Sequence, residues 1–447
     1  MAPGGSLVVA LRGDLARGRE VSQRRPAVGR SCALSRGCGR EAPARPQPRR
    51  PAPTVLLEGA CKTLRGAAAA PAKAQACGLL CELSGRAIGA QDEVGARGGV
   101  EAILAALRGT SDVALRTAAM GALHASCAHH AGNLRRFVAD GGVQTVVAAM
   151  EANLEATGLQ QAGVGLLRNA AACDAECQAD VAAAGGVGAV LGAMCSHAGA
   201  APLQEAGCGA LKEIASRSKS NQEVILASGG IQILLRTMEA HAGLMSVQII
   251  ACGLLRDLVT RSAEHQETAV CRGGAQLALQ AMRAFPQSAD VQRAAGGALF
   301  RMCEDNEEMQ AEVFAYGAVR VVMKAMDAHQ AEPRVQEAAC CVLGELAEDV
   351  VRDRALLTSA VHEVLKAASS HSTCGALQAA AHRAVQRLAA FDREGWVKSC
   401  VVGRCGRFGR DTTKRMLASI DKVAPPLAVI EESSEEEDDH EGDVSHE

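Results

Sequence analysis

Cysteine is the most frequent residue in this chain that could bind a metal ion or act as a nucleophile. The chain has 447 residues, of which 18 are cysteines. Two pairs have the spacing Cys-x-x-x-Cys, namely Cys77/Cys81 and Cys173/Cys177. A zinc ribbon needs a second matched pair at a defined distance, and neither pair has one. The sequence therefore predicts no metal site at these pairs.

The remaining reactive side chains also favour structural roles. We interpret Cys127, His129 and His130 as a buried cysteine followed by two loop histidines. His124 and His382 are isolated in helical segments, where packing or surface roles are expected. The sequence has no GxxxxGK[ST] loop to hold a nucleotide phosphate, and no nucleophile can be paired with a base. We therefore predict that the protein is not an enzyme and needs no cofactor and no metal.

The elements that carry these residues repeat with a period of about 44 residues. A glycine followed by Gly or Ala recurs at this spacing, and so does a methionine. The glycines are Gly98, Gly141, Gly185, Gly229, Gly273 and Gly317, and the methionines are Met150, Met194, Met238, Met282 and Met326. A unit copied at this period cannot bury its apolar face alone and must stack on its neighbours.

Each repeat is predicted to contain three helices. Leu134–Ala139 is a short first helix, which Gly141 ends by turning the chain sharply. Val143–Met150 is a second helix with an apolar face at helical spacing, and a third helix begins near Leu159. Apolar residues make up 48% of the chain and aromatic residues 2%, which favours helices packed closely through Ala, Leu and Val. No apolar run is long enough to predict a membrane span.

The third helix carries the clearest pattern. Its first position is apolar in nearly all copies, its fifth is always Ala or Gly, and its ninth is Leu or Val. The ninth position reads Leu80, Leu123, Leu167, Leu211, Leu255, Leu299, Leu343 and Val385. This spacing predicts one broad buried stripe. Cysteine recurs at core positions of the same register, at Cys77, Cys208, Cys252 and Cys340, so we interpret it as a small buried hydrophobe in a reducing compartment.

The pattern Gly-Gly-Val-x-x-Val-Val-x-x-Met, followed by a loop and Val-Gln-x-Ala-Ala-x-x-x-Leu, resembles the armadillo repeat over roughly residues 55–390. It is most similar to the subgroup found in armadillo-repeat-containing proteins and in the armadillo region of leucine-rich-repeat kinases. The resemblance implies an all-α fold, a right-handed α-solenoid of about eight three-helix repeats. It also implies protein binding along a concave groove that the third helices line.

The groove positions differ from those of importin-type armadillo proteins. In that family the seventh and eleventh third-helix positions carry Trp and Asn, which grip basic peptides. The seventh position here reads Gly78, Gly121, Gly165, Gly209, Gly253, Gly297, Cys341 and Arg383. The eleventh reads Glu82, Ala125, Asn169, Glu213, Asp257, Arg301, Glu345 and Arg387. Because only Asn169 fits the family pattern, a nuclear-transport cargo adaptor is the disfavoured alternative.

We therefore predict a non-catalytic scaffold or adaptor that captures partner proteins. The candidate groove residues are Glu82, Asn169, Glu213, Asp257, Arg301 and Glu345. In one hypothesis, the acids among them face basic residues of an extended or helical partner segment. In the alternative, they belong to solvated helix faces. A helical-repeat family with two helices per unit is a further alternative, but the Gly-Gly break and the extra first helix argue against it.

The ends of the chain differ from the repeats in composition. Residues 1–53 are rich in Arg and Pro and predict a disordered segment or an organelle transit peptide, and residues 431–447 predict a disordered acidic tail. Residues 54–390 form the predicted solenoid. Residues 391–430 predict a basic capping segment with an amphipathic helix at Asp411–Asp421.

The net charge of −3 is nearly neutral, so nucleic-acid binding is not expected. We expect a monomer in the cytoplasm, with the nucleus or an organelle as alternatives. The identity of the partner is not predicted.

Overall fold

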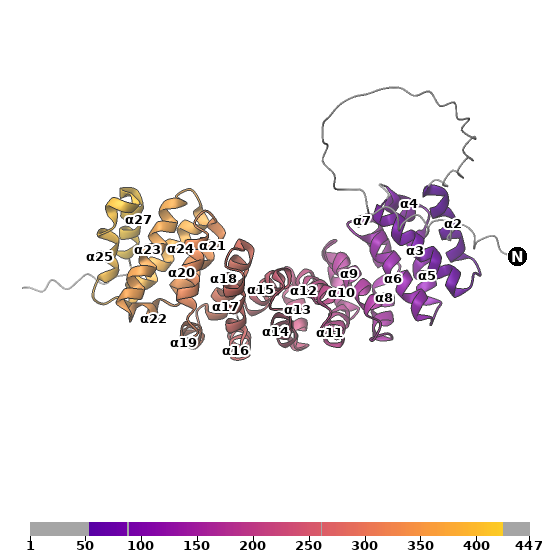
Figure 1. The fold of residues 1–447 in the computed structure, drawn as a ribbon, viewed down its shortest axis with the longest axis horizontal. Helices are drawn as coiled ribbons and strands as arrows, with labels where there is room; N and C mark the ends of the chain where they lie inside the picture. The colour runs from indigo at the N-terminus through magenta and orange to yellow at the C-terminus, as the bar shows by residue number, and fades with distance from the viewer. Residues whose placement is uncertain (1–52, 87–88, 261, 423–447) are drawn as a thin grey trace, which may run out of the picture. The chain divides into compact units, whose positions relative to one another are not determined.

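The computed structural model describes residues 53–86, 89–260 and 262–422, and within these ranges every regular element is a helix (Figure 1). The helices fall into two compact units, which divide between Ser196 and His197. The predicted disordered tails lie outside the described residues, except that Pro53 begins the first helix. The expectation of an all-α repeat fold is therefore confirmed.

The first unit contains three third helices with the shorter helices that accompany them. Its helices are α2 (Pro53–Arg65), α3 (Ala70–Arg86), α4 (Ala90–Ala96), α5 (Gly99–Arg108), α6 (Val113–Cys127), α7 (Ala131–Ala139), α8 (Gly142–Glu151), α9 (Thr157–Ala171), α10 (Ala175–Ala183) and α11 (Gly186–Ser196). The third helices are α3, α6 and α9. The first described helix, α2, corresponds to the second helix of a repeat.

The second unit contains five third helices and a C-terminal cap. Its helices are α12 (Ala201–Ala215), α13 (Lys219–Ala227), α14 (Gly230–Ala240), α15 (Met245–Val259), α16 (Ala263–Cys271), α17 (Gly274–Ala284), α18 (Ala289–Cys303), α19 (Glu307–Ala315), α20 (Ala318–Ala328), α21 (Pro333–Glu345), α22 (Ala347–Val351), α23 (Arg354–Ser370), α24 (Gly375–Phe391), α25 (Trp396–Val402), α26 (Cys405–Phe408) and α27 (Arg410–Ile420). The third helices are α12, α15, α18, α21 and α24.

Two glycines set the sharp turn between the first and second helices of a repeat. Gly229 precedes α14 with a φ of 75°, in the left-handed region that favours glycine. At Gly230 a Cβ atom would lie 2.4 Å from Cγ2 of Ile225, which is fully buried on α13. The first glycine therefore supplies the backbone conformation, and the second lets the two helices approach closely.

Within each unit, helices of the same kind pack on one another in sequence (Figure 1). In the second unit α12 contacts α15, which contacts α18, and the series continues through α21 to α24. The eight aligned residues at the ninth third-helix position are at most 1% exposed. The predicted stripe is therefore the core, and within each unit neighbouring third helices cover one another.

A buried glutamine fixes the start of the third helix and was not assigned a role from the sequence. The side-chain amide of Gln248 donates to the carbonyl oxygens of Met238 at 2.8 Å and His241 at 3.1 Å. The same pair of bonds recurs at Gln160, Gln292, Gln336 and Gln378. Because these carbonyls end the second helix, the glutamine satisfies acceptors that would otherwise be buried without donors.

The C-terminal helices pack against the last repeat. Helix α27 packs on α24 and α25, and its residues Met416 and Ile420 are buried, while Leu417 is half-buried. The final repeat also differs from the others, because α23 is one 17-residue helix without a glycine break. The repeat series therefore ends in a modified unit that covers the apolar face of α24.

Candidate protein-binding surface

The candidate surface is the face that the seventh and eleventh positions of successive third helices form, which we name the third-helix face. In the first unit it includes Glu82 and Asn169, and in the second unit Glu213, Asp257, Arg301 and Glu345. Successive third helices contact one another within a unit, so equivalent residues recur on neighbouring helices.

Glycines at the seventh position make room for side chains of the preceding third helix. A Cβ atom at Gly297 would lie 3.3 Å from Cδ of Arg256, and one at Gly253 would lie 3.9 Å from Nζ of Lys212. In the first unit, a Cβ atom at Gly165 would lie 2.7 Å from Nε2 of His124. The tenth residue of one third helix thus extends across the glycine of the next. Basic side chains cover the places where importin-type proteins carry Trp.

The six residues predicted for the groove differ in solvent exposure. Glu82 is exposed, Asn169, Glu213, Asp257 and Arg301 are half-buried, and Glu345 is buried. Asp257 forms an ion pair with Arg256, with 2.7 Å between Oδ1 and Nη2. Arg301 pairs with Glu304 and lies over the ring of Phe300, 5.0 Å from its centroid. The second unit therefore presents alternating acids and bases rather than a field of one sign.

Glu345 is the predicted residue with the most internal partners. Its Oε1 lies 2.6 Å from Nη1 of Arg387, and its Oε2 accepts hydrogen bonds from the Gln310 amide and the Asp305 backbone N–H, each at 3.2 Å. Burial raises the pKa of the Glu345 carboxyl, against the lowering effects of the Asp305 N–H and of Arg387. The residue therefore holds Arg387 and the α18–α19 corner in place.

A cavity of about 370 Å³ opens beside Glu345. Phe300 of α18 lines it together with Cys341 and Glu345 of α21 and Arg383 and Arg387 of α24. Seventh and eleventh positions therefore meet in one depression. Arg383 is exposed and places a guanidinium at this depression.

The core cysteines do not have the chemistry of nucleophiles. Burial raises the pKa of the Cys208 and Cys252 thiols to about 12, and it raises the pKa of Cys303 and Cys340 further. A neutral buried thiol is a poor nucleophile and a poor ligand. These side chains contribute packing, which is the role that the repeat register predicted.

Cys127 and His130 of the local Cys–His cluster also have structural roles. Cys127 is fully buried. His130 caps α7, because its Nδ1 accepts from the Asn133 backbone N–H at 3.0 Å, and its Nε2 lies 2.9 Å from Oδ1 of Asp92. Burial lowers the pKa of His124 and of His382, so both favour the neutral imidazole. Among the described residues, the group whose donor atoms could hold a metal ion is Cys173, Asp174 and Cys177.

Among the described residues, none of the helices is by itself both long and apolar enough to cross a bilayer. The helices α10 and α11 reach that length and composition only as a pair, and they are bent by 66° relative to each other.

Comparisons with known proteins agree with this architecture. Residues 231–395 match the family model described as LRRK2 ARM repeat. A crystal structure of an engineered protein from the Northeast Structural Genomics Consortium is similar with a TM-score of 0.60 and 19% identity, over 82% of this chain and 99% of that one. No curated protein matches the sequence.

A further similar structure comes from work on a phosphorylation switch that controls the interaction between cadherin and beta-catenin. It has a TM-score of 0.59 and 15% identity, over 82% of this chain and 83% of that one. At these identities the solved structures establish the fold. The matching family model supports an assignment to the armadillo repeat for residues 231–395.

Proposed function

We propose that this protein is a non-catalytic scaffold or adaptor that captures a segment of a partner protein on the third-helix face of its second unit. One observation carries the proposal: half-buried charged residues recur at the eleventh position of the successive third helices α12, α15 and α18. Their charged groups could fix the register of a partner segment along this face.

The chemistry of the face suggests which residues the partner presents. Glu213 and Asp257 occupy the same position of α12 and α15, and both are half-buried. Ion pairs at such sites are shared with solvent and exchange at little cost. We infer that basic side chains of the partner replace Arg256 as the neighbour of Asp257 and bind Glu213 in the same way.

Glu345 has a supporting role in this proposal. Its carboxylate is already bonded to three groups, so it orients Arg387 instead of contacting the partner directly. Arg383 and Arg387 border the cavity of about 370 Å³. An acidic or polar residue of the partner would suit this end of the face.

A peptide library displayed on phage would test the proposal on the purified chain. We expect selected peptides to be rich in Lys and Arg and to bind the double variant Glu213→Lys, Asp257→Lys at least tenfold more weakly. The matched control is Glu223→Lys, Glu239→Lys, which changes the net charge equally at exposed residues of α13 and α14. Equal binding to wild type and to the Glu213, Asp257 variant would contradict the proposal.

We also propose that the protein is located in the cytoplasm. The described cysteines are free thiols, and many are buried at core positions, which suits a reducing compartment such as the cytoplasm. Imaging of the tagged full chain would test this, and accumulation in an oxidising compartment would contradict it.

A further inference from the structure

We propose that Cys173, Asp174 and Cys177 form a binding site for one divalent cation that prefers thiolate ligands, namely Zn²⁺. The site lies at the corner between α9 and α10, inside the first unit. Two thiolates and a carboxylate are a donor set that zinc accepts, with a fourth position left for water.

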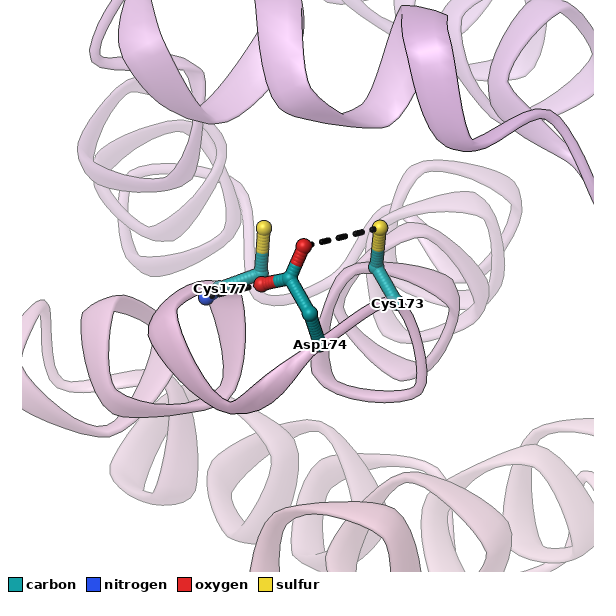
Figure 2. Close-up of side chains that lie close together, drawn as sticks. All are labelled: Cys173, Asp174 and Cys177. Atoms are coloured by element: carbon teal, nitrogen blue, oxygen red, sulfur yellow. Dashed lines mark hydrogen bonds between the residues drawn. The ribbon is translucent and has the colours of Figure 1, made fainter.

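The three donor groups lie on one side of this corner. Figure 2 shows the sulfur atoms of Cys173 and Cys177 and the carboxylate of Asp174 directed toward the same region. Their potential ligand atoms all lie within 4.8 Å of one another, and Sγ of Cys173 is 3.6 Å from Oδ2 of Asp174. In a tetrahedral zinc site, sulfur–oxygen and sulfur–sulfur separations are about 3.5 Å and about 3.8 Å. Small side-chain rotations would therefore complete the geometry.

Cys173 does not follow the packing pattern of the core cysteines. One period away, the position of Cys173 carries His129 and Arg217, both with a positive φ, and that of Cys177 carries Asn133 and Asn221. The amides of these asparagines donate to carbonyl oxygens of the preceding third helix, at 2.8 Å and 2.9 Å. In this repeat the Cys177 thiol stands where the other two repeats have an asparagine amide bonded to the preceding third helix. Cys177 is 3% exposed and packs in the core, as the buried Met309 does at the same repeat position. Cys173 is half-buried, so core packing does not account for its thiol.

The corner already holds the carboxylate in an orientation suited to a metal. Asp174 is the N-cap of α10, and its Oδ1 accepts from the Cys177 backbone N–H at 2.9 Å. This bond leaves Oδ2 directed toward the sulfur of Cys173. Hydrogen bonds to a ligating carboxylate fix its orientation in the way that outer-shell partners do in known metal sites.

The ionisation of the groups determines how a metal would bind. Hydrogen bonds from Cys177 hold the pKa of Asp174 at about 2, so its carboxylate is charged. Burial raises the pKa of Cys173, and it raises that of Cys177 to about 12. Both thiols are thus protonated before binding, and the cation must displace two protons to the solvent. Affinity should therefore increase with pH.

Arg135 of α7 is the charged group that faces the cluster from a neighbouring helix. Its Nε lies 3.2 Å from Oδ2 of Asp174, so it competes with a cation for that oxygen. The Arg135 side chain is 66% exposed and can turn into solvent at little cost. We therefore expect Arg135→Gln to bind the cation more tightly than wild type.

The test is a Zn²⁺ titration of the reduced full chain against a chromophoric chelator, repeated with Co²⁺ to detect thiolate coordination by its charge-transfer absorption. We expect wild type to bind one equivalent more than Cys173→Ser or Cys177→Ser. Asp174→Asn keeps a capping oxygen and should weaken binding about tenfold. Circular dichroism will establish that each variant is folded, and Cys173→Ser, at a half-buried turn residue, is the variant least expected to disturb the fold.

The controls are Cys81→Ser and Cys195→Ser. Cys81 belongs to the other Cys-x-x-x-Cys pair, inside α3, and Cys195 is exposed. Both should retain the stoichiometry of wild type. The proposal would be overturned by equal stoichiometry in wild type and folded Cys173→Ser, or by the absence of thiolate absorption with Co²⁺. A Cys173–Cys177 disulfide that forms in the presence of Zn²⁺ and reductant would overturn it as well.

Discussion

Two carboxylates at repeat corners, Asp174 in the first unit and Glu345 in the second, have similar partners and opposite pKa shifts. Each accepts a hydrogen bond from a backbone N–H and lies against an arginine. The pKa of Asp174 is held at about 2, whereas that of Glu345 is raised. The side chain of Asp174 is 32% exposed and that of Glu345 is 8% exposed.

The difference shows that access to water, more than the number of donors, decides the ionisation of a corner carboxylate in this fold. Donors stabilise the charged form at both sites, but desolvation opposes it, and at Glu345 desolvation is the larger effect. Asp174 thus remains a charged group available to a cation, while Glu345 is a structural group.

The hydrophobic core near Asp174 and the hydrophobic core near Glu345 should contribute equally to the free energy of unfolding. Leu167 on α9 and Leu343 on α21 occupy the same repeat position and are fully buried. We expect Leu167→Ala and Leu343→Ala each to lower the free energy of unfolding by about 2–5 kcal/mol, because each leaves a cavity. Urea unfolding followed by circular dichroism would measure this. A small loss at only one site would show that the two units are packed differently.

Removal of the buried Glu345 carboxylate should have the next largest effect on the free energy of unfolding. Glu345→Ala leaves the Gln310 amide, the Asp305 N–H and Arg387 without their common acceptor. We expect a loss of about 1–3 kcal/mol in the free energy of unfolding, measured in the same urea experiment. Asp257→Ala removes an acid at the equivalent position of α15 and is the matched control. A loss at Glu345 no greater than that at Asp257 would contradict the structural role.

The cap at Asp174 should contribute less. Asp174→Ala removes the acceptor for the Cys177 N–H and should cost about 0.5–2 kcal/mol, whereas Asp174→Asn keeps an oxygen in the capping position. We expect the Asn variant to lie closer to wild type in thermal unfolding without added metal. Equal losses in the two variants would indicate that the charge, and not the cap, stabilises α10.

The smallest expected effect is an opposite dependence of stability on pH. The raised pKa of Glu345 favours its protonated form in the folded state, so its contribution is present below its ordinary value of 4.5 and is lost as pH rises through the folded value. Wild type should therefore lose stability relative to Glu345→Gln as pH increases from 4. The lowered pKa of Asp174 gives a contribution that is present above 3.8 and is lost as pH falls toward about 2.

Urea unfolding of wild type, Glu345→Gln and Asp174→Asn between pH 3 and pH 6 would measure these slopes. The stability difference between wild type and each variant is the informative quantity, because other titrating groups cancel. Slopes of the same sign at both sites would refute the explanation by access to water.

The repeat register predicted most of the core correctly. Leu255 and Leu299 were assigned from spacing alone and are fully buried, because a helical stripe repeated at a fixed period leaves one arrangement that buries every copy. The turn at Gly229 followed from an equally local signal. The binding role of the residues on the third-helix face stays a prediction.

The roles of individual polar residues were less predictable. Gln248 lies in a recognisable motif, but its two carbonyl partners come from the end of another helix. Cys173 and Cys177 lack a second cysteine pair, and Asp174 completes the donor set only because the corner turns it toward the sulfur of Cys173. A search for a capping acid between paired cysteines at a repeat corner would have found this cluster.

The amino-acid sequence determines the period, the three helices of a typical repeat and the stripe that forms the core. These features depend on the periodic burial of apolar side chains. The tertiary structure alone decided which equivalent acids are buried, paired or open to solvent. Glu82 and Glu345 share a repeat position, yet one is exposed and the other buried, because the surroundings of each residue are built by helices of neighbouring repeats. Ionisation depends on those surroundings, and local sequence does not specify them.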